Sequence, residues 1–260
     1  MSKDKTLYNL FHHGGRLSTA DTLLNSIDQN KIDHSVVMGM GWSDYSFNRY
    51  VNDYLIESEI RSDGRLVAVT GITPQHGDKG IYEAERCMTA GSHGFGEVHL
   101  SEQGLSGKSF HFLKPYMHML ITKEFPLVVH SSEPVGHLYQ GKGQTNPKEL
   151  ENLVKFFPNN KMVLAHWGGG FLFYEMMREV EDLLRNIFYD TAASPLLYND
   201  KIFDVSLEIV GANKILFGSD YPLMKQKNIF KTLNISRFNA TEKSLIHGEL
   251  SASVFKITTR

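Results

Sequence analysis

Short apolar runs alternate with helical segments along the chain, and few folds accommodate such an alternation. Seven runs recur at steps of about 25–35 residues. Most are too continuously apolar for a strand with one wet face, which is typical of strands buried on both faces of a parallel sheet. The runs lie at 33–40, 65–72, 93–100, 126–131, 161–166, 187–192 and 214–220. Strands that alternate with helices form βαβ units with right-handed crossovers, so the sequence predicts a parallel α/β fold.

The number of runs indicates the architecture. A (β/α)₈ TIM barrel closes with eight strands and takes roughly 250 residues, so 260 residues fit one such domain over 1–260. A helical segment at 18–31 precedes the first run, however, and only 6–11 could supply an earlier strand, as a poor candidate. The sequence therefore predicts a (β/α)₈ barrel whose first strand is missing or replaced. Such a barrel has a gap between 33–40 and 214–220.

Two helical segments carry clear apolar spacing. The stretch 150–157 follows the i, i+3, i+4, i+7 pattern behind Pro147, which is tolerated in a first turn. A second apolar stripe covers 173–184. We expect both to pack against the sheet, because amphipathic stripes usually bury their apolar side. The residues 18–21 resemble a capping box at the start of the first helix.

Composition excludes several kinds of protein. Lys and Arg total 27 and Asp and Glu total 29, so the net charge of -2 lacks the basic signature of a nucleic-acid binder. No apolar run approaches the roughly 18–20 residues of a membrane span, and the N-terminus leads into no apolar signal core. The single cysteine, Cys87, excludes an internal disulfide and suits a reducing compartment. We expect a cytoplasmic enzyme with a small-molecule substrate and neither a nucleic-acid nor a membrane partner.

Three polar residues follow apolar runs at equivalent places. His130 follows PLVV, His166 follows MVLA, and Asp220 follows LFGS. In a parallel barrel the carboxyl ends of the strands form the mouth where active sites are built. Two imidazoles and a carboxylate there suit a divalent metal that activates water. Each residue alone is more often structural, but their joint occurrence at three strand ends predicts a shared site.

Four further residues are weaker candidates for substrate binding. Glu97 and His99 are two apart and face one side of a strand, toward a pocket or toward solvent. His137 lies in a glycine-bearing loop, where a plain surface loop is the default. Trp167 adjoins His166 and precedes three glycines, which form either an anion-binding turn or only a tight connection.

The segments VVHSSEPVGH, VLAHWGGG and ILFGSDYPL, together with GFGEVHL and YDTAASPLLY, resemble the amidohydrolase-related metal-dependent hydrolases. Within them they resemble the branch that includes aminocarboxymuconate-semialdehyde decarboxylase, from about Ser18 to Phe255. The resemblance implies a (β/α)₈ barrel with a divalent metal, often zinc, at its mouth. It implies that His130 is a metal ligand and that Asp220 touches the metal and takes a proton from its water. His166 would act as an electrophilic or acid–base group beside the metal.

The chain departs from this family at one point. The family carries a His-x-His pair on its first strand, and this sequence contains none. His12 and His13 are adjacent, so on a strand they point to opposite faces and cannot both reach one metal. The absent pair coincides with the absent strand. We therefore expect weak metal binding, with His130 and Asp220 as direct ligands and His166 as a recruit. We also expect the chain to associate with other copies through the open seam, and a homodimer is one possible product.

The leading interpretation is a metal-dependent hydrolase that acts on a small carbonyl or carboxylate substrate through a metal-activated water. Zn²⁺ is the expected ion, with Mn²⁺ as the alternative. Non-oxidative decarboxylation in the same architecture is the close alternative function. A non-catalytic or truncated barrel that has lost two metal ligands is the third, and metal analysis of the purified protein separates it from an enzyme. The substrate, the native metal and the oligomeric state stay open.

Overall fold

A computed structural model describes residues 4, 10 and 17–258 of the chain. Its strands are all parallel and fall into a pair, β1-β2, and a five-stranded sheet in the order β3-β4-β5-β6-β7. A single bridge between Thr70 and Phe95 continues the ladder from β2 to β3. Each of the seven predicted runs contains one strand, so this part of the prediction is confirmed. The strands are β1 Ser35–Met38, β2 Leu66–Val69, β3 Phe95–Val98, β4 Leu127–Val129, β5 Met162–Leu164, β6 Ile187–Asp190 and β7 Ile215–Leu216.

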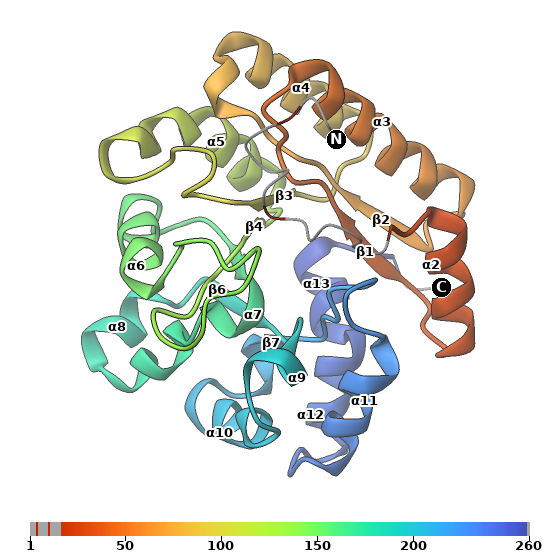
Figure 1. Ribbon diagram of the computed structural model, residues 1–260, viewed down its shortest axis with the longest axis vertical. Coiled ribbons are helices and arrows are strands. Elements are labelled where there is room, and N and C mark those ends of the chain that lie inside the picture. The colour runs from red at the N-terminus through yellow and green to blue at the C-terminus, as the bar shows by residue number, and fades with distance from the viewer. Residues whose placement is uncertain (1–3, 5–9, 11–16, 259–260) are drawn as a thin grey trace.

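Helices surround the strands as an outer ring (Figure 1). The α-helices are α2 Ala20–Gln29, α3 Tyr45–Arg61, α4 Asp78–Thr89, α5 Lys114–Lys123, α6 Pro147–Phe156, α7 Ala165–Gly168, α8 Arg178–Leu183, α9 Ser194–Leu197, α10 Lys201–Val210, α11 Gln226–Ile235, α12 Ala240–Ser244 and α13 Leu250–Phe255. Short 3₁₀ turns occupy η1 Pro74–His76, η2 Gly107–Leu113, η3 Phe171–Met176 and η4 Ala212–Lys214, and η5 Leu245–Glu249 is a π-helical turn.

The structure confirms some of the predicted helix features and contradicts others. Asn146 caps α6 by accepting from the backbone N–H groups of Lys148 and Glu149, and its apolar stripe is buried as predicted. The capping box of α2 lies one residue later than predicted, with Thr19 as the cap and Thr22 as its partner. The second stripe is not one helix. It breaks into η3 and α8, and Met176 at the end of η3 is 71% exposed, so the prediction of one helix is wrong. Val180 and Leu184 of the stripe do lie in the core, as predicted.

The core has two layers because the central strands are buried on both faces. Val128 of β4 and Val163 of β5 point into the barrel, whereas their neighbours along each strand lie in a larger cluster under the helices. Burial of each such side chain stabilises the fold by about 1.5–3 kcal/mol. Phe255 of α13 joins the inner layer at the amino-terminal end of the strands, where its carbonyl accepts a hydrogen bond from His93. This double burial is what produces the continuously apolar runs.

The barrel is open along one seam, which we define as the space between β1 and β7. Among the described residues β1 pairs only with β2, and β7 pairs only with β6. The predicted gap between 33–40 and 214–220 is therefore confirmed for that part of the chain. One side-chain hydrogen bond spans the seam, from Ser26 Oγ on α2 to Gln226 Oε1 on α11 at 2.9 Å. The segment 6–11, the candidate for an extra strand, lies largely outside the described residues.

Candidate metal centre

Three side chains from consecutive strands meet at the carboxyl end of the barrel. Glu97 belongs to β3, His130 follows β4, and His166 follows β5 at the start of α7. Glu97 Oε1 lies 2.9 Å from His130 Nδ1 and 3.8 Å from His166 Nε2. One ligand atom of each residue lies within 4.8 Å of the other two, a spacing that could hold a metal ion. We call these residues the trio.

Both histidines of the trio present one ring nitrogen inward and direct the other to a backbone carbonyl. His130 Nε2 lies 3.2 Å from the Lys142 carbonyl oxygen, and His166 Nδ1 lies 3.3 Å from that of Ala192. Histidines that ligate metals almost always donate their outer N–H to such an oxygen, because it fixes the tautomer and the ring orientation. The inward nitrogens are thus arranged as metal ligands.

The opposite charges of His130 and Glu97 shift the pKa of each group and hold the two side chains together. Burial alone would lower the pKa of His130, but the hydrogen bond and charge of Glu97 raise it to about 9. Burial alone would raise the pKa of Glu97, but His130 and the neighbouring histidines hold it well below its usual range. A divalent cation can take the place of the proton between these two groups, since both offer it a lone pair or a charge.

The loop between β4 and α6 fixes the carbonyl that faces His130. The Lys142 ammonium group is buried and donates to the carbonyls of Val135 and His137, at 2.6 and 3.2 Å. The hydroxyl of Ser132 donates to the Lys142 carbonyl from below. These hydrogen bonds within the loop keep the Lys142 carbonyl within reach of His130 Nε2.

The backbone after β5 turns sharply at the trio. His166 has φ +57° and ψ +46°, and Trp167 has φ +59°, so two residues with side chains occupy the left-handed region. That region costs roughly 1–2 kcal/mol for each such residue. Gly169 continues the turn, and a Cβ there would lie 2.3 Å from the carbonyl oxygen of Ser132. The three glycines thus form a tight connection.

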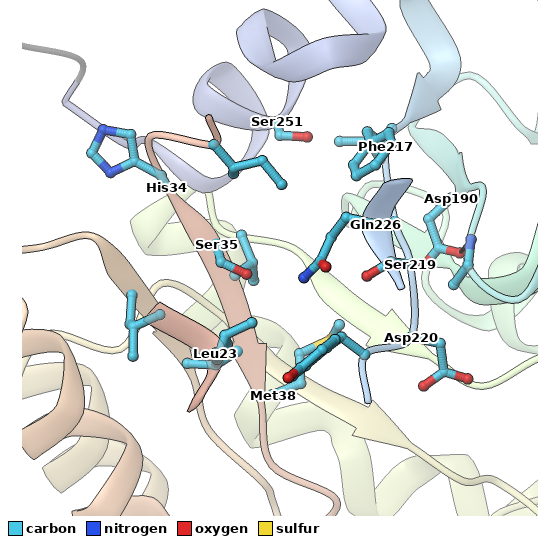
Figure 2. Close-up of a pocket in the computed structure, with 18 of the residues that line it drawn as sticks. Leu23, His34, Ser35, Met38, Asp190, Phe217, Ser219, Asp220, Gln226 and Ser251 are labelled. Carbon is cyan, nitrogen blue, oxygen red and sulfur yellow. Dashed lines mark hydrogen bonds between the residues drawn. The ribbon is translucent and has the colours of Figure 1, made fainter. Parts of the chain in front are cut away.

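Two carboxylates lie beside the trio. Asp190 ends β6, and its Oδ1 accepts from the backbone N–H groups of His166 and Ala192, at 2.9 and 3.0 Å. Burial raises the pKa of Asp190 to about 6. Asp220 follows β7, and desolvation raises its pKa, while the charge of His166 partly opposes the shift. Figure 2 shows Asp190 and Asp220 on one side of the cavity, opposite Ser35 and Met38 of β1.

A cavity of about 1150 Å³ connects the mouth with the seam. Glu97, His166, Asp190 and Asp220 line its polar part. Its other walls come from the inner core layer, from β1 and from helices α2, α11 and α13 on the two sides of the seam. Two members of the trio, Glu97 and His166, therefore face a space with both polar and apolar walls.

The predicted site residues divide into two groups. The structure brings His130, His166 and Glu97 into contact and sets Asp220 close enough for its charge to act on both histidines. Asp220 does not belong to the trio within the described part of the chain. Glu97, predicted only as a weak substrate contact, lies at the centre of the trio.

The other three weak candidates do not line the cavity. His99 is buried and stacks on His130 at a ring distance of 4.5 Å, and its ring nitrogens find no partner among the described residues. Burial lowers the pKa of His99 to about 3. Trp167 lies in the core, where Nε1 donates to Ser194 Oγ at 2.7 Å. His137 is exposed on its loop.

Sequence reasoning missed Asp190. The residue ends the run 187–192, so the rule that selected His130 and His166 at strand ends could also have selected it. The carbonyls of Lys142 and Ala192 left no such signal, because any residue supplies a carbonyl.

The fold and the site define a parallel α/β barrel protein with a candidate metal centre at its mouth. Comparison with known proteins identifies the family. The chain belongs to the amidohydrolase family, whose model matches residues 23–242. The predicted resemblance is thereby confirmed. No curated protein matches the sequence significantly.

Solved structures share the fold at low sequence identity. A 5-carboxyvanillate decarboxylase from Sphingomonas paucimobilis superposes with a TM-score of 0.70 at 17% identity, covering 90% of this chain and 82% of that one. A dihydroxybenzoic acid decarboxylase from a Polaromonas species, which holds manganese and the inhibitor 2-nitroresorcinol, gives 0.72 at 16%, covering 94% and 88%. A further structure, described as an amidohydrolase II, gives 0.79 at 14%, covering 97% and 95%. None of the described helices is long and apolar enough to cross a membrane.

Proposed function

We propose that this protein is a divalent-metal-dependent enzyme that removes CO₂ from a small, ring-bearing carboxylate without oxidation. The observation that carries the proposal is the trio, in which both histidines direct their outer ring nitrogen to a carbonyl and their inner one to Glu97. Decarboxylation was the second interpretation of the sequence, behind hydrolysis. It moves ahead because similar folds belong to decarboxylases, one of which holds 2,6-dihydroxybenzoate and another the inhibitor 2-nitroresorcinol.

The residues present fit a divalent cation. Glu97 Oε1, His130 Nδ1 and His166 Nε2 would hold it, and two imidazoles with one carboxylate suit Zn²⁺ or Mn²⁺. The Polaromonas enzyme holds manganese, which favours Mn²⁺ for this chain. When bound, the cation supplies positive charge that polarises the oxygens of the substrate.

Asp220 would carry the proton that the reaction consumes. It faces the cavity beside His166, so its carboxyl group can reach a substrate held at the trio. Asp220 passes a proton to the ring carbon that bears the carboxylate. The bond between that carbon and the carboxylate then breaks, its electron pair stays with the ring, CO₂ leaves, and water restores the proton on Asp220. One carboxylate and one proton thus give one C–H bond and one CO₂.

The apolar part of the cavity favours the loss of the carboxylate. Val128, Val163 and Leu216 line the space below the trio. Water excluded by these side chains cannot solvate the carboxylate, and electrostatic interactions are stronger there than in water.

Metal analysis combined with CO₂ release tests the proposal. The purified full chain is loaded with Mn²⁺ and incubated with 2,6-dihydroxybenzoate or 5-carboxyvanillate, next to a panel of esters and amides. Because Glu97 adds a third possible ligand to the two histidines, we expect near-stoichiometric metal in place of the weak binding that the sequence predicts. We also expect metal-dependent CO₂ release from at least one carboxylate. Hydrolysis of the panel without CO₂ release would restore the first interpretation, and failure to bind Mn²⁺ at millimolar concentration would favour the non-catalytic barrel.

A further inference from the structure

One oxygen of Asp190 makes two contacts that converge on the same histidine. Oδ1 accepts from the backbone N–H of His166 at 2.9 Å and from that of Ala192 at 3.0 Å. The carbonyl of Ala192 in turn lies 3.3 Å from His166 Nδ1. Asp190 is thus hydrogen-bonded to the backbone of His166 directly and is linked to the His166 ring through Ala192.

Both the backbone and the ring of His166 need hydrogen bonds to hold their conformation. Its backbone lies in the left-handed region, which is strained for a residue with a side chain. The hydrogen bond from the His166 N–H to the carboxyl oxygen of Asp190 holds this conformation, because hydrogen bonds to carboxylates are stronger than those to neutral acceptors. The ring also needs a fixed acceptor at Nδ1, because otherwise Nε2 would not be held toward Glu97 at 3.8 Å.

We propose that Asp190 is a positioning residue that sets the backbone and the ring of His166, so that Nε2 faces the metal position. The inference rests on the proposed function of the trio and adds a residue that acts through His166. Asp190 is 7% exposed and sits at the end of β6, so its own place is fixed by the sheet. Rigid support of this kind is what separates a tight metal site from a loose one.

The adjacent Thr191 offers a matched control. Its hydroxyl donates to the Gly218 carbonyl and accepts from the Gly218 N–H, both at 2.9 Å, and the residue is fully buried. Thr191→Val therefore removes buried hydrogen bonds at the same strand end without touching His166. Asp190→Asn retains an acceptor oxygen for both N–H groups, whereas Asp190→Leu retains none.

Calorimetric titration of the full chain with Mn²⁺ compares wild type with these three variants, and thermal melting confirms that each is folded. We expect Asp190→Leu to lose about 10–100-fold in Mn²⁺ affinity, the usual effect of an outer partner. Asp190→Asn and Thr191→Val should stay within about threefold of wild type, whatever their melting temperatures. Equal affinity of a folded Asp190→Leu variant would overturn the inference, and so would an equal loss in Thr191→Val.

Nitrogen-15 NMR of the histidine side chains gives a readout that needs no metal. In the metal-free chain we expect the Nδ1–H of His166 to be fixed in wild type and in Asp190→Asn, and averaged in Asp190→Leu. If Asp190→Leu does not fold, Asp190→Ser takes its place, because its shorter side chain reaches at most one of the two N–H groups. A wild type that binds no Mn²⁺ but shows the expected NMR difference would refute the proposed function and leave this inference standing. Identical His166 signals in all variants would overturn the inference itself.

Discussion

At the scale of single residues, the trio shows why His130 and His166 can be predicted and the role of Glu97 cannot. A polar residue after an apolar run lies at the mouth of a parallel barrel wherever the fold is correct. Glu97 lies inside its strand, where an alternating pattern leaves open whether it faces a pocket or solvent. Only the distances to His130 and His166 show that it is the centre of the trio.

Replacement of Glu97 tests its place in the trio. Glu97→Gln removes the only carboxylate of the trio, and the remaining amide oxygen is a weaker ligand. We expect the variant to lose on the order of a hundredfold or more in Mn²⁺ affinity, since even an outer partner is worth 10–100-fold. Calorimetric titration measures the loss. Glu85→Gln, at an exposed position on α4, is the control and should bind as wild type does.

Replacement of Asp220 separates proton transfer from metal binding. Asparagine keeps the shape of aspartate but cannot carry the proton, so Asp220→Asn should reduce turnover on the order of 10²–10⁴-fold. Because Asp220 does not belong to the trio, Mn²⁺ affinity should change far less. Steady-state kinetics and calorimetry on the same preparation check both. An equal loss of affinity and turnover would instead make Asp220 a ligand, as the resemblance implies.

At the scale of elements, the positions of strands are easier to predict than the continuity of helices. Strands buried on both faces need apolar residues at every position, which leaves a clear signal. The stripe at 173–184 carries helical spacing but becomes η3 and α8, because Met177 between them has an extended backbone that interrupts the helix. Apolar spacing alone does not show such an interruption.

One contact between elements makes the stability of the fold depend on pH. His93 Nε2 lies 3.1 Å from Glu59 Oε1 on α3, and Nδ1 lies 2.6 Å from the Phe255 carbonyl on α13. Both partners are acceptors, so both ring nitrogens must carry a proton. The hydrogen bond to Glu59 is the main cause that raises the pKa of His93, although burial opposes it.

The stabilisation from His93 should be fully present below its unfolded pKa of about 6.5 and should be lost as pH rises through the raised folded value. The difference in melting temperature between wild type and His93→Gln should therefore be larger at pH 6 than at pH 9. Thermal melts across this range measure it. A difference independent of pH would mean that His93 stabilises the fold as a neutral ring.

At the scale of the whole molecule, the seam decides how the chain meets other molecules. Within residues 17–258, β1 and β7 each have one edge without a neighbouring strand, and such edges expose backbone donors and acceptors that can pair with another chain. Met38 lies on β1 at the seam and is 39% exposed. We expect concentration-dependent association of the wild type by light scattering after size exclusion. Met38→Lys should weaken it, because a charge on a strand edge opposes pairing.

The exposed Ile60 at the end of α3 provides the control for that experiment. Ile60→Lys adds the same charge away from the seam and should associate as wild type does. Association that both variants weaken equally would reflect charge alone. A wild type that stays monomeric at all concentrations would show that the seam is covered within one chain.

The Ser26–Gln226 hydrogen bond is a weak closure for a ring of strands. A closed ring opens only when a whole backbone ladder breaks, but here one side-chain hydrogen bond, worth about 0.5–1.5 kcal/mol, spans the described edges. We therefore expect β1 and β7 to separate transiently along the seam, which would expose their backbone amides to exchange with solvent. Hydrogen exchange should be slowest in β4, β5 and β6, which have a strand on each side, and fastest in β1 and β7. The seam would then be a hinge line as well as a gap, and ligands could enter the cavity from the side of the barrel.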